Sequence, residues 1–218
     1  MKNYFVIANV LPGKLNAAIK NIMKQIGVKD PNEAVRMLNA GELQISIIKS
    51  EWHEKDGVIY FTVTSDGTTG EEWGPRLKSK GSFITDYTNS VLCSKNFQPT
   101  KPTFYKVAVL KGEIFDDSER ITKKIRQEAR KQKLLIPNAE LAPLIREKFS
   151  DKELEAMGLY RIVVMHESIK DSGGDTVQLS ANRNDNDSWL DTRYDNHDDE
   201  WDCSDGFAFV VSQVELGS

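Results

Sequence analysis

The chain has 218 residues, of which 39% are hydrophobic and 28% are charged, so it can form one large or two small cores. Its net charge of −4 is unevenly distributed, because residues 171–218 carry twelve acidic and only two basic residues. This segment would repel the phosphates of nucleic acids, which argues against non-specific nucleic-acid binding there.

Cysteine usage and apolar runs indicate the compartment. Cys93 and Cys203 form no metal-binding motif such as CxxC, and two free thiols in a reducing compartment are the simpler interpretation. The apolar run from Tyr4 to Leu11 has no small-residue cleavage site after it and predicts a first strand rather than a signal peptide. Since no apolar stretch reaches the roughly 20 residues of a membrane span, we expect a cytoplasmic protein with no membrane partner.

Residues 1–100 are predicted to form a small α+β accessory domain. After the strand at 4–11, helical periodicity predicts helices over 15–26 and 30–41, and alternation predicts a strand at 43–47. A strand at 58–63 follows, with Asp56-Gly57 as the hairpin turn before it. Gly74-Pro75 argues against a long helix after Thr69, whereas a short helix is expected over 86–92. The polar segment 94–102 is the expected linker.

Residues 103–218 are predicted to form a second α+β domain. Strands are expected at 104–110, 160–165 and 207–211. Two helices are expected around Ile125 and Ile145, and a capping box at Ser150–Glu153 predicts a third, short helix. The polar excursion from about residue 170 to 205 is too long for an ordinary connection, so it is expected to be functional or disordered.

The polar stretch 182–205 is the strongest candidate for a binding region. It contains eight Asp and four Asn in 24 positions, yet Trp189, Tyr194 and Trp201 recur within it, which disordered segments lack. We expect Trp189, Leu190, Trp201 and Phe207 to form a packed frame. The polar residues between them are the predicted ligand contacts: Asn182, Asn184, Asp185, Asn186, Asp187, Ser188, Asp191, Arg193, Tyr194, Asn196, His197, Asp198, Asp199, Asp202, Ser204 and Asp205.

The residue types of this stretch suggest two other kinds of chemistry. Asp and Asn oxygens suit calcium, but the EF-hand register fails, which leaves an irregular site from Asp195, Asp198, Asp199 and Glu200 as an alternative. Catalysis has little support, because a nucleophile pair of Cys203 and His197 has no identifiable orienting group or oxyanion site. We therefore expect no enzyme activity and no obligatory cofactor.

The order of elements resembles the C-type lectin fold, and the C-terminal arrangement resembles the variable proteins of diversity-generating retroelements. The resemblance is carried by the strand at 160–166, by the stretch 182–205 with its two tryptophans, and by the closing segment 206–211. It covers residues 103–218. It implies a C-type-lectin-like display domain whose variable region, about 182–205, is diversified by adenine-directed mutagenesis and binds a ligand.

Codon chemistry offers an internal check on this resemblance. Mutating the adenines of an Asn codon cannot give Lys, Gln, Met, Glu or Trp. The stretch 182–205 contains no Lys, Gln or Met, and its only unreachable residues are Trp189, Glu200 and Trp201. The two tryptophans are the residues that we assign to the frame on grounds of size.

The sequence therefore predicts a non-enzymatic binding protein that presents a polar and aromatic surface to an unknown protein or glycan. One alternative is a calcium-dependent carbohydrate-binding domain on the same fold. The other is a nucleic-acid-binding regulator that uses the N-terminal helix pair, in which Lys20 and Lys24 share a face.

Overall fold

The computed structural model describes Lys20, Met23, Lys24 and residues 27–42, 51–171, 173–184, 187–195 and 200–216. The chain divides into two compact units, residues 1–49 and residues 50–218. The expected strands at 4–11 and 43–47 lie outside the described residues. In the first unit, the predicted second helix is confirmed as α2 (Pro31–Asn39), where Asp30 Oδ1 accepts a hydrogen bond from the backbone N–H of Asn32 at 2.9 Å.

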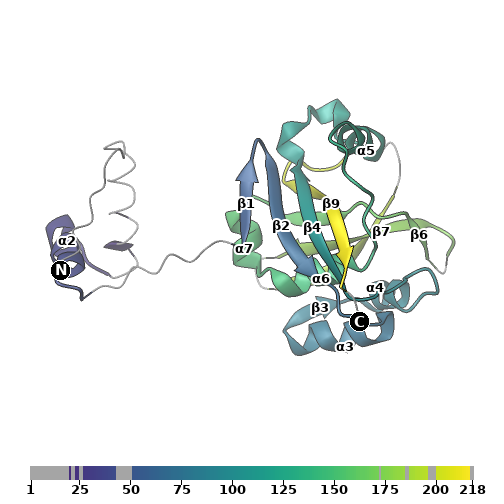
Figure 1. Ribbon diagram of the computed structural model, residues 1–218, viewed down its shortest axis with the longest axis horizontal. Coiled ribbons are helices and arrows are strands. Elements are labelled where there is room, and N and C mark those ends of the chain that lie inside the picture. The colour runs from purple at the N-terminus through teal and green to yellow at the C-terminus, as the bar shows by residue number, and fades with distance from the viewer. Residues whose placement is uncertain are drawn as a thin grey trace. The chain divides into compact units, whose positions relative to one another are not determined.

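The second unit is built on one mixed sheet of nine strands, shown in Figure 1. Its order is β1-β2-β4-β9-β5-β7-β8-β3, with β6 paired to β7. The strands are β1 (Trp52–Lys55), β2 (Val58–Thr64), β3 (Ser82–Ile84), β4 (Thr103–Lys111), β5 (Arg161–Val164), β6 (Ile169–Lys170), β7 (Thr176–Arg183), β8 (Ser188–Tyr194) and β9 (Asp205–Glu215). β9 pairs parallel with β5 and β3 pairs parallel with β8, whereas the other pairs are antiparallel.

Six α-helices and two 3₁₀ turns are described along the chain. They are α2, already given, η1 (Gly112–Ile114), η2 (Asp117–Glu119), α3 (Gly70–Ser79), α4 (Asp86–Leu92), α5 (Thr122–Lys131), α6 (Leu141–Lys148) and α7 (Asp151–Ala156). The predicted capping box of α7 is confirmed, because Ser150 and Glu153 exchange side-chain-to-backbone hydrogen bonds. The expectation that Gly74-Pro75 prevents a long helix is wrong, since α3 continues through both residues with Trp73 and Leu77 fully buried.

The expected domain boundary near residue 100 does not match the division of the chain. β2 pairs with β4 across the polar segment 94–102, in a register that runs from Val58↔Leu110 to Thr64↔Phe104. Residues 52–92 therefore belong to the same sheet and core as the C-terminal half. The coarse prediction of an α+β fold is confirmed, with the boundary between compact units at residue 49.

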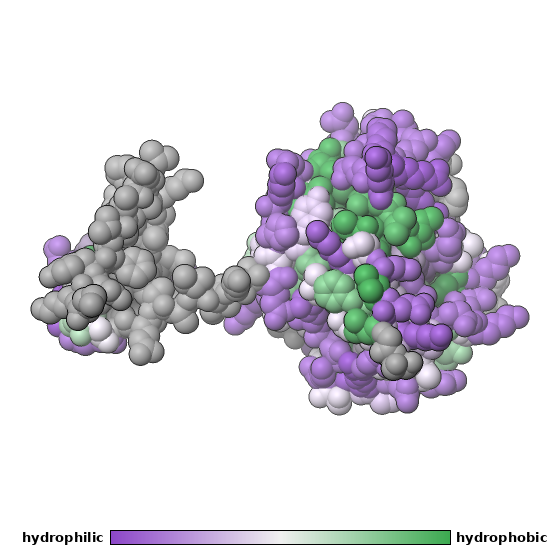
Figure 2. Space-filling model, in the orientation of Figure 1, coloured by the Kyte–Doolittle hydropathy of each residue, from purple (hydrophilic) through white to green (hydrophobic). Residues whose placement is uncertain are grey.

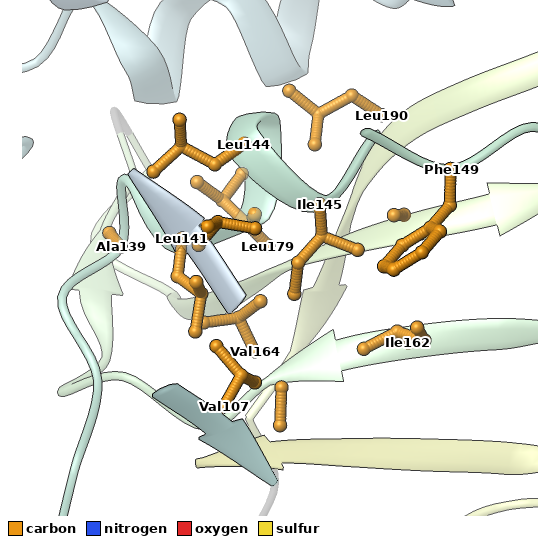
Figure 3. Packing of buried hydrophobic residues seen from close by; sticks show 14 of the residues in the cluster. Val107, Ala139, Leu141, Leu144, Ile145, Phe149, Ile162, Val164, Leu179 and Leu190 are labelled. Atoms are coloured by element: carbon orange, nitrogen blue, oxygen red, sulfur yellow. The ribbon is translucent and has the colours of Figure 1, made fainter. Parts of the chain in front are cut away.

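The two faces of the sheet differ in what covers them. On one face, helix residues such as Leu144, Ile145 and Phe149 pack on strand residues such as Ile162 and Leu179 (Figure 3). On the other face, Ile125 and Ala129 of α5 pack on Val58, Leu110, Val163, Phe207 and Phe209. This second cluster covers only the β2-β4-β9-β5 part of its face.

An apolar patch also reaches the surface of this unit. Figure 2 shows hydrophobic residues gathered in the middle of the visible face, over the region where Figure 1 draws β4 and β9. Phe104 and Val214, which are paired across these two strands, are 38% and 59% exposed. In the part of the chain that the structure describes, every helix is too short or too polar to traverse a lipid bilayer.

A buried histidine joins β5 to β7 and gives the fold a pH dependence. His166 is 1% exposed, its Nε2 accepts a hydrogen bond from the Leu179 N–H at 3.0 Å, and its Nδ1 lies 2.7 Å from the Glu167 carbonyl oxygen. Burial lowers the pKa of His166 to about 4. Nε2 is thus the unprotonated nitrogen, and protonating it would break the bond to the Leu179 N–H.

We predict that this histidine destabilises the fold in mild acid. Between pH 6.5 and pH 4 the unfolded chain binds a proton that the folded chain excludes, so the stability that is fully present above pH 6.5 falls as the pH falls. The loss at pH 4 should be on the order of 3 kcal/mol. Urea unfolding at pH 7 and pH 4 would measure it, with His166→Gln as the comparison because Gln keeps an acceptor but does not titrate. Equal losses in the two proteins would contradict this prediction.

Candidate functional site

Beyond the residues that pack under α5, the second sheet face carries a row of polar and aromatic residues. Paired residues on neighbouring strands point to the same face of a sheet. The pairs Phe83↔Trp189, Trp189↔Asn182, Asn182↔Arg161 and Arg161↔Asp205 therefore place five side chains in one row across β3, β8, β7, β5 and β9. No sequence pattern indicated this arrangement, because it depends on which strands become neighbours.

Trp189 lies on this sheet face rather than in the core. Its ring stacks on Phe83 with 5.2 Å between the ring centroids, and Phe83 is 47% exposed. The next residue, Leu190, points to the opposite face and is fully buried in the main core. The frame role predicted for Leu190 is thus confirmed, whereas Trp189 is half-buried at the surface.

Two of the predicted contact residues are buried, which corrects the expectation that they point to solvent. Asn182 is 5% exposed, and its Nδ2 donates to Asp191 Oδ2 at 3.3 Å. Its backbone carbonyl accepts a hydrogen bond from Arg146 Nη1 at 2.8 Å. Asp205 is fully buried and forms an ion pair of 2.6 Å with Nε of Arg161. Asn182 thus links β7 to β8, and Asp205 links β9 to β5, instead of pointing to solvent.

A hollow of about 650 Å³ opens where this row meets the segment before α5. Its lining combines charged and aromatic side chains from four parts of the chain. These are Asp117, Arg120, Arg161, Arg193, Tyr194, Glu200, Trp201, Asp202, Cys203 and Asp205. Four of the predicted contacts line it, namely Arg193, Tyr194, Asp202 and Asp205. Sequence reasoning did not identify Asp117, Arg120 and Arg161 as candidates.

Arg120 fixes the floor of the hollow. It is 8% exposed and donates hydrogen bonds to the carbonyl oxygens of Gly112 at 3.1 Å, Phe115 at 3.2 Å and Trp201 at 3.3 Å. Its own carbonyl oxygen accepts from the Trp201 N–H at 2.8 Å. Moving the Arg120 guanidinium away would leave several backbone carbonyl oxygens without a hydrogen-bond partner. These hydrogen bonds therefore hold segment 200–201 against η1.

Trp201 serves as the aromatic anchor of the same segment. Its Nε1 donates to Thr122 Oγ1 at 3.0 Å, and its ring packs edge-on against Phe207 with centroids 5.8 Å apart. Phe207 is fully buried in the cluster under α5. The frame roles predicted for Trp201 and Phe207 are therefore confirmed.

The rim of the hollow is much more exposed than its floor. Tyr194 is 59% exposed, and Asp202 and Cys203 are also exposed. Hydrogen bonds from the N–H and hydroxyl of Ser204 lower the pKa of Asp202, so this carboxylate is ionised at neutral pH. By contrast, burial raises the pKa of Asp205, with Arg161 opposing the shift.

The remaining candidates are dispersed or lie outside the described residues. Asp185, Asn186, Asn196, His197, Asp198 and Asp199 are in the latter group. Asn184, Asp187 and Ser188 lie at the turn between β7 and β8, and Ser188 Oγ donates to Asp151 Oδ1 at 2.9 Å. Asp191 accepts from Asn182 and pairs with Arg193 at 3.4 Å. The predicted contacts thus fall into a cluster at the hollow and a second group at this turn.

Of the four residues in the calcium alternative, Asp195 and Glu200 lie among the described residues. Asp195 is 2% exposed, and its Oδ2 accepts hydrogen bonds from Ser168 and Gln178 rather than facing solvent. Among the described residues there is no group of three or more His, Cys, Asp and Glu side chains that could hold a metal ion. Cys93 and Cys203 are both free and exposed.

Comparisons of this chain with protein-family models, with curated proteins and with solved structures found no match.

Proposed function

We propose that the protein is a non-enzymatic binding protein, the target of a diversity-generating retroelement, whose C-terminal region presents a variable surface on a lectin-like scaffold. The observation that carries this proposal is the difference between a buried, hydrogen-bonded floor of the hollow and an exposed rim. Buried contacts of Arg120, Arg161 and Trp201 hold its floor, while Tyr194, Asp202 and Cys203 on its rim are exposed.

A diversified site requires such a fixed floor and an exposed rim. Substitutions at exposed positions without special contacts usually change stability by no more than about 0.5 kcal/mol. A rigid floor keeps the backbone of the rim in place while the rim side chains change, which limits the entropy lost on binding. In other variable binding surfaces, Tyr supplies a large amphipathic contact area and small polar residues supply adaptable hydrogen bonds.

The test is a variant that changes the rim residues together with the neighbouring, half-buried Arg193 and Ser204. Arg193→Ser, Tyr194→Asn, Asp202→Asn, Cys203→Ser and Ser204→Asn should be combined, since an Asn codon mutated only at its adenines reaches every new residue. We expect the thermal midpoint to stay within a few degrees of the parent, because none of these side chains is buried. A display screen of both proteins against panels of proteins and glycans should select different ligands.

Trp201→Ala provides the matched control on the floor. Removing this large aromatic should cost about 3 kcal/mol, and it should lower the thermal midpoint clearly. Cooperative unfolding of the five-residue variant at a much lower temperature, comparable to that of Trp201→Ala, would show that the rim is structural. The proposal of a variable surface would then fail.

A further inference from the structure

Each arginine that lines the hollow is already paired with a carboxylate. Arg161 pairs with Asp205 at 2.6 Å and Arg120 pairs with Asp117 at 2.8 Å. Arg193 pairs with Asp191 at 3.4 Å, and both of these side chains are partly exposed. The positive charges of the lining are therefore offset within the protein and leave no arginine free for an anionic ligand.

Two carboxylates of the lining form no such ion pair with an arginine. Glu200 and Asp202 are both exposed, and within the described part of the chain neither forms an ion pair with a basic side chain. Asp202 accepts hydrogen bonds from the N–H and hydroxyl of Ser204, and the nearby Arg161, which already pairs with Asp205, also lowers its pKa. The hollow thus carries an excess of negative charge at neutral pH.

Aromatic rings complete the lining. Tyr194, which is 59% exposed, and Trp201 both border the hollow. A cation over the face of such a ring is attracted by the negative potential of the π-system. Carboxylates and aromatic rings together favour a flat cation, because a guanidinium can donate in its plane to carboxylates while its face lies on a ring.

We propose that the hollow binds the guanidinium group of an arginine side chain on a protein partner. Glu200 and Asp202 would accept its hydrogen bonds, and Tyr194 and Trp201 would contact its planar face. This assignment rests on the proposed binding function and names the ligand class for the present sequence. The volume of about 650 Å³ accommodates an arginine side chain together with its flanking backbone.

The experiment is an NMR titration of the full chain with a defined probe. The probe is the peptide acetyl-Gly-Gly-Arg-Gly-Gly-amide, and its analogue with citrulline in place of arginine has nearly the same shape but no charge. The indole N–H of Trp201 and the backbone N–H of Cys203 report on the hollow. We expect saturable shifts with the arginine peptide, with a dissociation constant on the order of 1 mM, and binding at least about tenfold weaker with the citrulline peptide.

Charge variants separate the hollow from general electrostatics. Glu200→Gln with Asp202→Asn should weaken binding about tenfold, as expected for the loss of two exposed ion pairs. Glu71→Gln with Glu155→Gln changes the net charge equally at exposed positions that do not line the hollow, and it should leave the affinity within about twofold. A thermal melt of each variant confirms that the fold is kept.

Three outcomes would overturn the assignment. Equal binding of the arginine and citrulline peptides would show that the hollow does not recognise the positive charge of the guanidinium, although the proposed binding function would stand. Equal weakening in both pairs of charge variants would place the interaction outside the hollow. Agmatine, a free guanidinium compound, binding as tightly as the peptide would assign a small molecule in place of a protein partner. Unfolding of the five-residue rim variant, by contrast, would remove the binding function itself.

Discussion

Deleting residues 206–218 should unfold the whole 50–218 unit. β9 lies inside the sheet and pairs with β4 on one side and with β5 on the other. Its residues Phe207, Ala208, Phe209 and Val210 are almost completely buried and belong to both core clusters. Their loss removes several large side chains, each worth about 2–5 kcal/mol, from a fold whose total stability is of the order of 5–15 kcal/mol.

Circular dichroism during heating would measure this effect, with a shorter deletion as the control. Removing only residues 214–218 takes away the exposed end of β9, so that variant should still melt cooperatively, a few degrees below the parent. A cooperative melt of the longer deletion at the parent's temperature would show that β9 is not the central strand of this fold.

The substitution Gly112→Ala should disrupt the hollow through a steric clash. A Cβ at this position would lie 2.7 Å, 2.8 Å and 2.9 Å from the carbonyl oxygens of Asp202, Cys203 and Asp205. All three atoms are backbone, so relief requires moving segment 202–205, which lines the hollow. We expect a loss of about 3 kcal/mol, at the upper end of the cost of overpacking.

Chemical denaturation of Gly112→Ala against Gly173→Ala would test this expectation. A Cβ at Gly173 would meet only side-chain oxygens at 3.4 Å or more, so that variant should change the unfolding free energy by no more than about 0.5 kcal/mol. The same small change in Gly112→Ala would mean that segment 202–205 can shift freely, and that the floor of the hollow is not rigid.

Local patterns predicted most of the helices and the strands β2, β4, β5 and β9, because their signals lie within a few residues, whereas the edge strands β1 and β3 were not predicted. The helix over 86–92 and the capping box at Ser150–Glu153 are examples. β7 and β8 were missed within the polar excursion, since their sequences mix polar residues with few branched apolar ones. Their strand pairing is supported by burial that the sequence does not reveal, such as that of Gln178 and Ser180, both fully buried.

For the candidate site, too, residue type alone did not reveal contacts made in the tertiary structure. Residue type indicated that the segment around Tyr194 and Asp202 is a surface, and the structure places both at the rim of the hollow. Residue type could not show that Asp205 is the buried partner of Arg161, because that pair joins strands 44 residues apart. Arg120 lies in an ordinary charged turn, and only the tertiary structure shows that it holds segment 200–201 against η1.

Sequencing the 3′ end of this gene from many independent isolates tests the central claim most directly. The account predicts that substitutions fall at adenines in the codons of rim residues such as Tyr194 and Asp202, and that Leu190, Trp201 and Phe207 do not vary. It also predicts a near-duplicate of this region beside a reverse-transcriptase gene. Substitutions spread evenly along the gene, with no excess at adenines and no such duplicate, would contradict the proposal that this surface is diversified.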